Sequence, residues 1–430
     1  MATELPRRLG LFSCVSVVAG TMIGSGIFLV PNLIARDLAS PWAILAMWIF
    51  GGLLSLAGGL AFAELGAMMP QAGGQYAWIR EAFGPLPAFL CGWMFFVIFL
   101  SASISWLGVA FSIYLSYFIP MEEWQRRAVG AAVISTLAYA NYRGLRVGAF
   151  VQGLLLVLKI AGMLLIIASA LLSPVNHWAA TPAVPLPTLP ALGSALIAIL
   201  LTYDGWMTLG LLAGEVRDPQ RNLPRGITLG IGLCMALYLI INFAYLKVLT
   251  VPETAAAERV AAQAATITMG PIGGKVIALV ILCSILGSMN GWMMAAPRTY
   301  YAQARDGLFF TRFAEVHPKY LTPSFSIMAQ AGWAILLVVS GTYSSLATFA
   351  MFSGWIGYTV AAIGLFVLRR KKPNVPRPYR MFGYPWMLLA FITVSSGFVL
   401  NTLLTDPVPS LIGVGLILAG LPAYRWFAMR

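Results

Sequence analysis

The sequence is poor in charged residues. Only 10% of its 430 residues are Asp, Glu, Lys or Arg, whereas 60% are hydrophobic. Soluble globular domains carry about 25% charged residues. No polar stretch is long enough to fold as a separate soluble domain, and the longest, from Ser173 to Pro190, is rich in proline and is predicted to be a loop. The composition therefore excludes a soluble protein and indicates an integral membrane protein.

Histidine and cysteine are also scarce. The two histidines, His177 and His317, fall in predicted loops, so zinc chemistry or a proton relay through histidine inside the membrane is not expected. All cysteines lie inside apolar runs, and no pair has the spacing of metal ligands: Cys14, Cys91, Cys234 and Cys283. The sequence therefore predicts no disulfide framework, no metal ion and no cofactor.

Acidic residues number 14 against 27 Lys and Arg, which gives a net charge of +13. The basic residues stand in short loops between apolar runs, which argues against a nucleic-acid partner. In membrane proteins Lys and Arg accumulate in cytoplasmic loops. Lys159 lies inside a predicted span. If the N-terminus is cytoplasmic, 20 of the other basic residues lie at cytoplasmic ends of spans and only six are external: Arg36, Arg126, Arg127, Lys247, Arg259 and Lys275. This bias predicts an even number of spans with both termini in the cytoplasm.

Apolar runs recur from end to end, and crossing a ~30 Å hydrocarbon core takes about 20 apolar residues. Arg7 and Arg8 precede the first run without a clear small-residue cleavage site, so we expect that run to be a retained span and not a signal peptide. The predicted spans are 11–35, 41–69, 86–119, 128–140, 147–173, 191–213, 226–250, 274–300, 325–340, 345–368, 384–404 and 408–426. The sequence thus predicts an all-α polytopic membrane protein with 12 transmembrane helices.

Two of these spans are interrupted by glycine and polar residues. The first contains GTMIGSG at 20–26, where each glycine weakens a helix by about 1 kcal/mol relative to Ala. The sixth contains TYDGW at 202–206. Because the interruptions lie five spans apart, the two spans run in opposite directions, as in an inverted repeat of five plus five helices. Paired interruptions of this kind are the best sequence indication of a transporter's substrate site.

The chemistry of an interrupted span suggests the substrate. Unwound backbone inside a membrane persists only where it is buried or lines a watery cavity. Its free N–H groups suit a carboxylate and its free C=O groups suit an ammonium, and an amino acid presents both. Gly20 and Gly24 are also typical of close helix packing, but the added Ser25 and Gly26, with the second break, favour a binding site.

Longer motifs identify a family. They are GTMIGSGIF in span 1, FAELGAMMPQAGGQYAWIREAFGPLPAFLCGW across spans 2 and 3, YDGW in span 6, GEVRDPQRNLPRGI after it, and SMNGWMMAAPRTYYAQARDGLFF in span 8. With them the chain resembles, from about Leu9 to Phe391, the bacterial branch of the L-type amino acid transporter family of the amino acid–polyamine–organocation superfamily. The resemblance implies a LeuT-type fold: a first repeat at about 9–190, a second at about 191–369, and two additional helices at about 382–430.

The same resemblance implies a function and a location. It implies sodium-independent amino acid transport by alternating access, often as obligatory exchange, in the bacterial inner membrane. Backbone recognition of the α-amino and α-carboxylate groups leaves a largely apolar pocket, so we expect neutral L-amino acids of small to medium size. Proton-coupled symport is the alternative.

Site residues carry over from the family by position. The N–H groups that match those holding the substrate carboxylate belong to Ser25, Gly26 and Ile27. The carbonyls that match those holding the ammonium belong to Met22, Leu201, Thr202 and Asp204. Trp355 in span 10 matches a pocket aromatic.

Two departures from the family matter. Several members have a bulky aromatic gate at the position of Leu201, which affects gating and side-chain size here. Animal members pair with a heavy subunit through a cysteine between spans 3 and 4. Because no cysteine lies in 119–127, we expect no disulfide-linked partner.

Lys159 lies near the middle of span 5. A span entering near Val147 places it twelve residues, or about 18 Å, into the membrane. An ammonium there costs at least ~2.5–3.5 kcal/mol on insertion scales, so it is expected to face the bundle interior. The resemblance implies that it replaces the sodium ion that sodium-dependent relatives hold between spans 1 and 8. We therefore predict that Lys159 tethers span 1 to span 8 through backbone carbonyls.

Rival functions lack support. A membrane enzyme needs a convergent set of acid, base or metal-binding groups, and the spans offer only Asp204, Lys159 and Glu64, dispersed in sequence. A channel would need rings of charges or carbonyls about a symmetry axis, which the sequence does not show. We therefore expect no enzymatic activity. The Asp204 side chain is either structural or titrates during transport.

Other polar residues have two interpretations each. Glu64 is predicted to be a capped or paired structural carboxylate. Asn290 and Gly291 either line the substrate path or pack helices. Arg369–Lys372 is predicted to anchor the chain to anionic lipid. The polar residues after span 6 either form ion pairs of an inner gate or belong to a solvated loop; they are Arg217, Asp218, Arg221, Asn222 and Arg225.

Overall fold

The structure is a computed structural model that describes residues 5–178, 187–340 and 343–429. These residues form helices and connecting loops without a β-strand; one isolated bridge joins Leu9 to Val216. Residues 179–186 of the predicted loop before span 6 lie outside the described residues.

Among the described residues, eight helical stretches are long and apolar enough to cross a membrane. Four of these stretches are single helices: α4 (Pro41–Met68), α9 (Leu145–Leu172), α12 (Pro219–Val248) and α19 (Trp386–Thr405). A fifth is the part of α18 (Tyr343–Lys371) from Thr348 onward. The other three combine α6 (Pro85–Met94), a π-helical turn (Phe95–Phe99) and α7 (Leu100–Leu115); α15 (Pro271–Ala295) and α16 (Pro297–Arg305); and α20 (Pro407–Leu418) and α21 (Gly420–Ala428). Four shorter apolar helices are α1 (Leu11–Met22), α10 (Leu189–Thr202), α14 (Val260–Met269) and α17 (Ser324–Ser340).

The remaining helices are more polar or very short. They are α2 (Gly26–Leu29), α3 (Pro31–Asp37), α5 (Gln75–Phe83), α8 (Glu123–Tyr142), α11 (Thr208–Leu211) and α13 (Val251–Ala256). The prediction of an all-helical membrane fold is confirmed. Each of the twelve predicted spans coincides with helix, but only eight stretches qualify by length and composition, so the count of twelve and the two repeats remain predictions.

Helix ends differ from the predicted spans where caps extend them. The fourth predicted span, 128–140, is longer in the structure because α8 begins at Glu123 behind a capping box. There the N–H of Glu122 donates to Oε1 of Gln125 at 2.8 Å, which satisfies a helix-end group.

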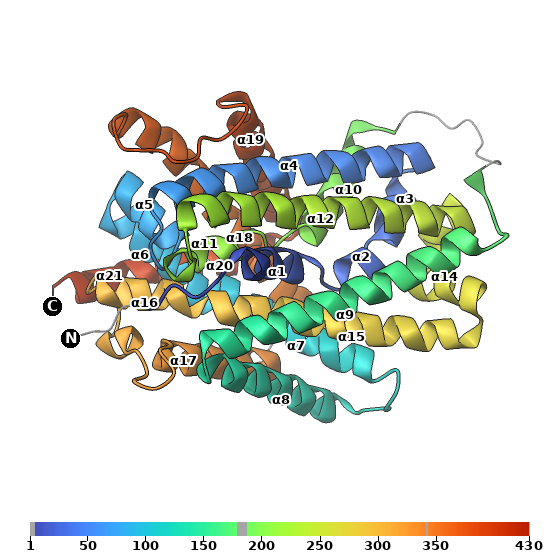
Figure 1. Ribbon diagram of the computed structural model, residues 1–430, viewed down its shortest axis with the longest axis horizontal. Helices are drawn as coiled ribbons and strands as arrows, with labels where there is room; N and C mark the ends of the chain where they lie inside the picture. The colour runs from blue at the N-terminus through green and yellow to red at the C-terminus, as the bar shows by residue number, and fades with distance from the viewer. Residues whose placement is uncertain (1–4, 179–186, 341–342, 430) are drawn as a thin grey trace.

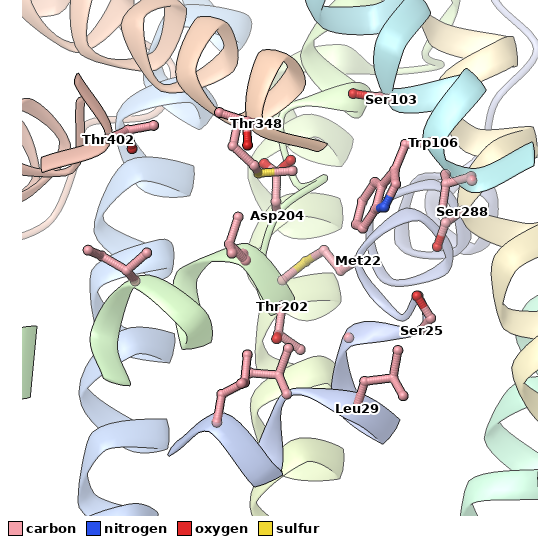
Figure 2. Close-up of a pocket in the computed structure, with 18 of the residues that line it drawn as sticks. Met22, Ser25, Leu29, Ser103, Trp106, Thr202, Asp204, Ser288, Thr348 and Thr402 are labelled. Atoms are coloured by element: carbon pink, nitrogen blue, oxygen red, sulfur yellow. The ribbon is translucent and has the colours of Figure 1, made fainter. Parts of the chain in front are cut away.

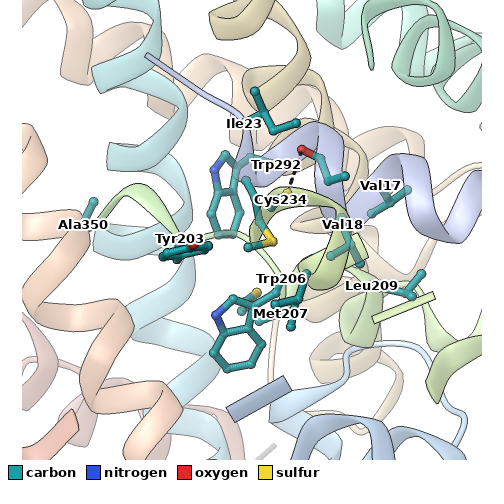
Figure 3. Packing of buried hydrophobic residues seen from close by; sticks show 14 of the residues in the cluster. Val17, Val18, Ile23, Tyr203, Trp206, Met207, Leu209, Cys234, Trp292 and Ala350 are labelled. Atoms are coloured by element: carbon teal, nitrogen blue, oxygen red, sulfur yellow. Dashed lines mark hydrogen bonds between the residues drawn. The ribbon is translucent and has the colours of Figure 1, made fainter. Parts of the chain in front are cut away.

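The helices run roughly along the long axis of the molecule, and the two chain ends lie at the same end of the bundle (Figure 1). α1 lies at the centre and packs against α9, α12 and α15, while α4 runs along α12. Contact between α1 and α12 depends on Gly226, where an added Cβ would lie 2.6 Å from the Cβ of Cys14. Two interrupted segments, 23–25 between α1 and α2 and 203–207 between α10 and α11, also meet at the centre. Figure 3 shows the apolar packing around them, which includes Val17, Val18, Ile23, Trp206, Met207, Leu209 and Cys234.

Candidate functional site

Two interruptions of helix lie at the centre of the bundle. α1 ends at Met22 and the chain resumes as α2 at Gly26; α10 ends at Thr202 and α11 begins at Thr208. These are the segments that the sequence marks by glycine and polar residues. Peptide groups at such ends lack partners within a helix and are available to a ligand.

The two interruptions contact each other because they contain glycine. Gly205 has a φ of +116°, a conformation that other residues rarely adopt. A Cβ there would lie 2.9 Å from Cγ2 of Thr21 and 3.1 Å from the backbone N of Met22. A Cβ at Gly26 would lie 3.0 Å from Oγ1 of Thr202. Any larger residue at either position would push the two breaks apart.

A cavity of about 470 Å³ lies against both breaks. Figure 2 shows Met22, Thr202 and Asp204 at this space, with Trp106 of α7 and Ser288 of α15 across from them. Its lining includes the exposed carboxylates Glu258 and Asp406, but none of its described lining residues is Lys or Arg. Its residues from the breaks are Thr21, Met22, Gly24, Ser25, Gly26, Leu201, Thr202 and Asp204, and the other walls include Leu29, Ser103, Leu107, Ile197, Trp292, Thr348, Met351, Phe398 and Thr402.

Two of the predicted site residues do not line the cavity. Ile27 is fully buried. The prediction for Ile27 concerned its backbone N–H and not its side chain. Trp355 is 2% exposed, and its ring stacks on that of Phe398 with centroids 4.7 Å apart. Phe398 does line the cavity, so Trp355 supports a wall and does not form it. The structure brings the other six together: Met22, Ser25, Gly26, Leu201, Thr202 and Asp204.

Tyr238 of α12 joins the two breaks, a role that the sequence did not indicate. Its hydroxyl lies 2.9 Å from the carbonyl O of Met22 and 3.2 Å from that of Thr202. These are two of the carbonyls assigned to the substrate ammonium. A hydroxyl has one proton, so Tyr238 donates to one of the two carbonyls at a time. The Met22 carbonyl also accepts from the N–H of Gly24 at 2.9 Å. A tyrosine inside an apolar span carries no sequence signal that distinguishes this contact from ordinary packing.

Lys159 of α9 lies behind the first break and is fully buried. Its ammonium donates to the carbonyl O of Gly20 at 2.8 Å, of Ile23 at 2.6 Å and of Ser284 at 3.1 Å. The first two carbonyls belong to α1 and its break, and the third belongs to α15. Ser288 of α15 also donates to the Ile23 carbonyl, at 3.2 Å. The first break is therefore held against α15 from its far side.

Asn290 lies away from the cavity, in a buried chain of amides. Its Nδ2 donates to Oε1 of Gln152 at 2.7 Å and its Oδ1 accepts from Asn141 at 2.9 Å. Gln152 in turn donates to the carbonyl O of Ser16 in α1 at 3.3 Å. Of the two interpretations of Asn290, this geometry favours helix packing. Gly291 also packs α15 against α1, since an added Cβ would collide with the hydroxyl of Thr21.

The Asp204 side chain reaches away from the backbone of its break toward α18. Its Oδ1 accepts a hydrogen bond of 2.6 Å from the hydroxyl of Tyr358. Asp204 also lines the cavity. It thus links the second break to α18 beside the place where a ligand would lie.

A buried ion pair lies at the end of the bundle that carries the termini. Nε of Arg298 in α16 lies 2.6 Å from Oε1 of Glu215, and both side chains are at most 1% exposed. The Glu215 carbonyl accepts from the N–H groups of Arg8 and Leu9, and the N–H of Arg217 donates to the Leu9 carbonyl, so the N-terminal segment is fastened to the same place.

A second, more exposed pair lies beside it. Arg80 and Asp306 are 2.6 Å apart, and the hydroxyl of Tyr76 donates to Asp306 at 2.9 Å. Burial, followed by the Asp306 carboxylate, raises the pKa of the Tyr76 phenol above its ordinary value. Within the described residues, none of the five loop residues considered for inner-gate ion pairs forms one; Asn222 donates to the Arg217 carbonyl at 2.6 Å.

Comparison with known proteins agrees with the motifs. A family model described as amino acid permease matches residues 9–424. The serine/threonine exchanger SteT of Bacillus subtilis (strain 168) is 33% identical over 429 residues, which cover 99% of this chain and 98% of that protein. Human b(0,+)-type amino acid transporter 1 is 30% identical, with coverage of 99% and 88%, and the human cystine/glutamate transporter is 29% identical, with coverage of 99% and 86%. The chain therefore belongs to the amino acid permease family.

Proposed function

We propose that this chain is a sodium-independent exchanger of neutral L-amino acids that works by alternating access. The observation that carries the proposal is the cavity that lies against two helix breaks, whose peptide groups offer both donors and acceptors to a zwitterion. A full-length relative that is a serine/threonine exchanger supports the substrate class. Homology to transporters along the whole chain also supports a protein without enzymatic activity.

Substrate recognition would use the backbone of both breaks. In this proposal the N–H groups of Ser25, Gly26 and Ile27 hold the carboxylate. The ammonium is held by carbonyls of Met22, Leu201, Thr202 and Asp204, two of which Tyr238 orients. The substrate side chain would face apolar and aromatic groups such as Trp106, Ile197 and Met351.

Charge in the cavity argues against acidic substrates. Asp204, Glu258 and Asp406 are the ionisable residues of its described lining, and all three are carboxylates. A glutamate side chain would meet repulsion and no basic partner, whereas a neutral side chain carries no such cost.

The proposed topology has twelve spans, an inverted repeat of five plus five helices with two more, and both termini in the cytoplasm. It makes the Glu215–Arg298 end cytoplasmic. The cavity, with Glu258 and Asp406 at its mouth, would then face outward, and transport would require that the buried pair separate. We also propose that no disulfide-linked subunit is needed, because 119–127 has no cysteine.

Proteoliposome exchange tests the function. Vesicles loaded with unlabelled serine should take up labelled serine, alanine or leucine much faster than empty vesicles, and replacing sodium with choline should not change the rate. Uptake of arginine or glutamate with none of the neutral amino acids would contradict the proposed substrate class. Uptake into empty vesicles that depends on a proton gradient would favour proton-coupled symport.

Lys159 supplies the proposed reason for sodium independence. Its ammonium joins α1 to α15 where a bound cation would otherwise be needed to hold the two helices. A sodium gradient requirement in the wild-type chain would reject this role.

A further inference from the structure

Six cations lie close together where α18 ends and the loop toward α19 begins. They are Arg369, Arg370, Lys371, Lys372, Arg377 and Arg380. Four of them have hydrogen-bond or carboxylate partners, and the other two have neither among the described residues. Only a cation without such a partner is available to bind a ligand outside the chain.

Glu64 of α4 organises this segment. Its buried carboxylate accepts two hydrogen bonds from Arg369, at 2.9 and 2.6 Å, and one from the N–H of Met381 at 2.6 Å. Nε of Arg377 lies 3.5 Å from the same carboxylate. The prediction that Glu64 is a paired structural carboxylate agrees with this arrangement, which fastens the loop to α4.

The next two lysines and Arg377 have structural roles as well. Lys371 donates to the Ala82 carbonyl at 3.1 Å, and Lys372 pairs with Glu81 of α5. Arg377 donates to carbonyls at the end of α18 and in the loop, which belong to Leu368, Lys372, Pro373 and Val375. Arg369, Lys371, Lys372 and Arg377 therefore already bind groups of the protein itself.

Arg370 and Arg380 remain. Both are exposed, and within the described residues neither has a hydrogen bond or a carboxylate partner. The guanidinium of Arg370 lies 4.4 Å from the ring centroid of Phe366, which is 6.2 Å from that of Tyr384 in the loop. Phe382, two residues after Arg380, is 77% exposed, and Trp386 is 76% exposed.

We propose that Arg370, Arg380, Phe382 and Trp386 bind an anionic phospholipid, with the arginines on its headgroup phosphate and the aromatic rings at the upper part of its acyl chains. Trp386 is the first residue of α19, an apolar candidate span, so it lies where that helix meets the membrane boundary. Aromatic residues favour this boundary, and cations next to it attract anionic lipid.

The aromatic pair favours a lipid over a soluble anion. A soluble phosphate or carboxylate would use the two arginines and make no contact with Phe382 and Trp386. A phospholipid satisfies the charges and covers the rings together. Because the loop is fastened to Glu64, a lipid held here is also linked to α4, which runs along α12 and contributes to the central bundle.

Lipid binding is measured on the purified full-length chain in nanodiscs or by native mass spectrometry. The probe is phosphatidylglycerol against phosphatidylcholine. The double variant Arg370→Gln/Arg380→Gln should bind phosphatidylglycerol at least about tenfold more weakly, and Phe382→Gln should weaken it severalfold. The matched control is Arg221→Gln/Arg225→Gln, which removes the same charge from two other exposed arginines and should bind normally.

Three outcomes would overturn the proposal. One is an equal loss in the control, which would indicate general attraction to a basic surface. Another is no loss in the Arg370/Arg380 variant. The third is full displacement of the lipid by millimolar glycerol phosphate, which would indicate a soluble anion as the ligand. None of these readouts depends on transport, so failure of the exchange function would be seen separately.

Discussion

Gly287→Ala tests whether the position of the Lys159 ammonium controls substrate binding without changing Lys159 itself. Gly287 lies on α15 beside that ammonium. A Cβ added there would lie 2.6 Å from Nζ and 2.8 Å from Cε of Lys159. Since an ordinary contact needs 3.4–4 Å, the end of the lysine has to move away from α15.

The size of the effect follows from the hydrogen bonds. Retreat from α15 lengthens the bond to the Ser284 carbonyl, which is already the longest of the three at 3.1 Å. A hydrogen bond to a charged group contributes roughly 1.5–3 kcal/mol. Since 1.4 kcal/mol is a factor of ten, the equilibrium constant that favours the held over the released first break should fall by about tenfold or more. We expect serine affinity to fall by up to this factor, since the affinity follows the fraction of molecules in which the break is held.

Affinity is measured on purified protein by titration calorimetry or by ligand-induced thermal stabilisation. Gly232→Ala on α12 is the matched control, because its Cβ would meet nothing within 4 Å. That variant should bind normally and gain about 0.5–1 kcal/mol of stability. In a Lys159→Ala background, itself expected to fold but transport poorly, Gly287→Ala should cause little further loss because no ammonium remains to displace.

Normal affinity in Gly287→Ala would refute the reasoning directly. Additive losses in the double variant would refute it as well, because residues that act through one interaction do not add.

Three further substitutions address the breaks and the buried ion pair. Tyr238→Phe removes the hydroxyl that joins both breaks and should lower substrate affinity severalfold, since a neutral hydrogen bond contributes about 0.5–1.5 kcal/mol; Tyr245→Phe is its control, because that buried hydroxyl has no partner among the described residues. Gly26→Val should reach the membrane folded but lose substrate binding in a scintillation assay, because its side chain enters the space between the breaks; normal binding would show that the carboxylate is held elsewhere. Glu215→Gln leaves Arg298 buried without its counter-charge and should lower thermal stability, with a loss of up to about 3–5 kcal/mol for a broken buried pair. It should also raise the reactivity of buried cysteines toward a thiol probe that enters from the end of the bundle with the termini. Unchanged melting and labelling would show that the pair does not hold that end of the bundle closed.

The sequence was sufficient for the membrane class and for the location of the breaks. Long apolar runs reflect the thickness of the bilayer, and this requirement is local. Glycine and polar residues in the middle of a span also act locally, since they weaken a helix where they stand. The family motifs were equally readable, because they are contiguous, and the amino acid permease match covers residues 9–424.

Contacts across the bundle could not be read in the same way. In an apolar span, buried and lipid-facing positions have similar composition, so periodicity does not show which side chains point inward. The family resemblance placed Trp355 in the pocket, whereas in the structure it supports a wall. No pattern in the sequence indicated that Tyr238 joins the two breaks. The buried ion pair joins Glu215 to Arg298, 83 residues apart, and not to the charged loop that follows Glu215.

Lys159 shows both what the sequence predicts and what only the tertiary structure determines. An ammonium in the middle of a span has to find acceptors, because leaving it unpaired in hydrocarbon is too costly, and this much follows from the sequence. Which carbonyls accept depends on where an unwound segment exposes them. Only the fold brings Gly20, Ile23 and Ser284, which lie 125 to 139 residues from Lys159, within 3.1 Å of its ammonium.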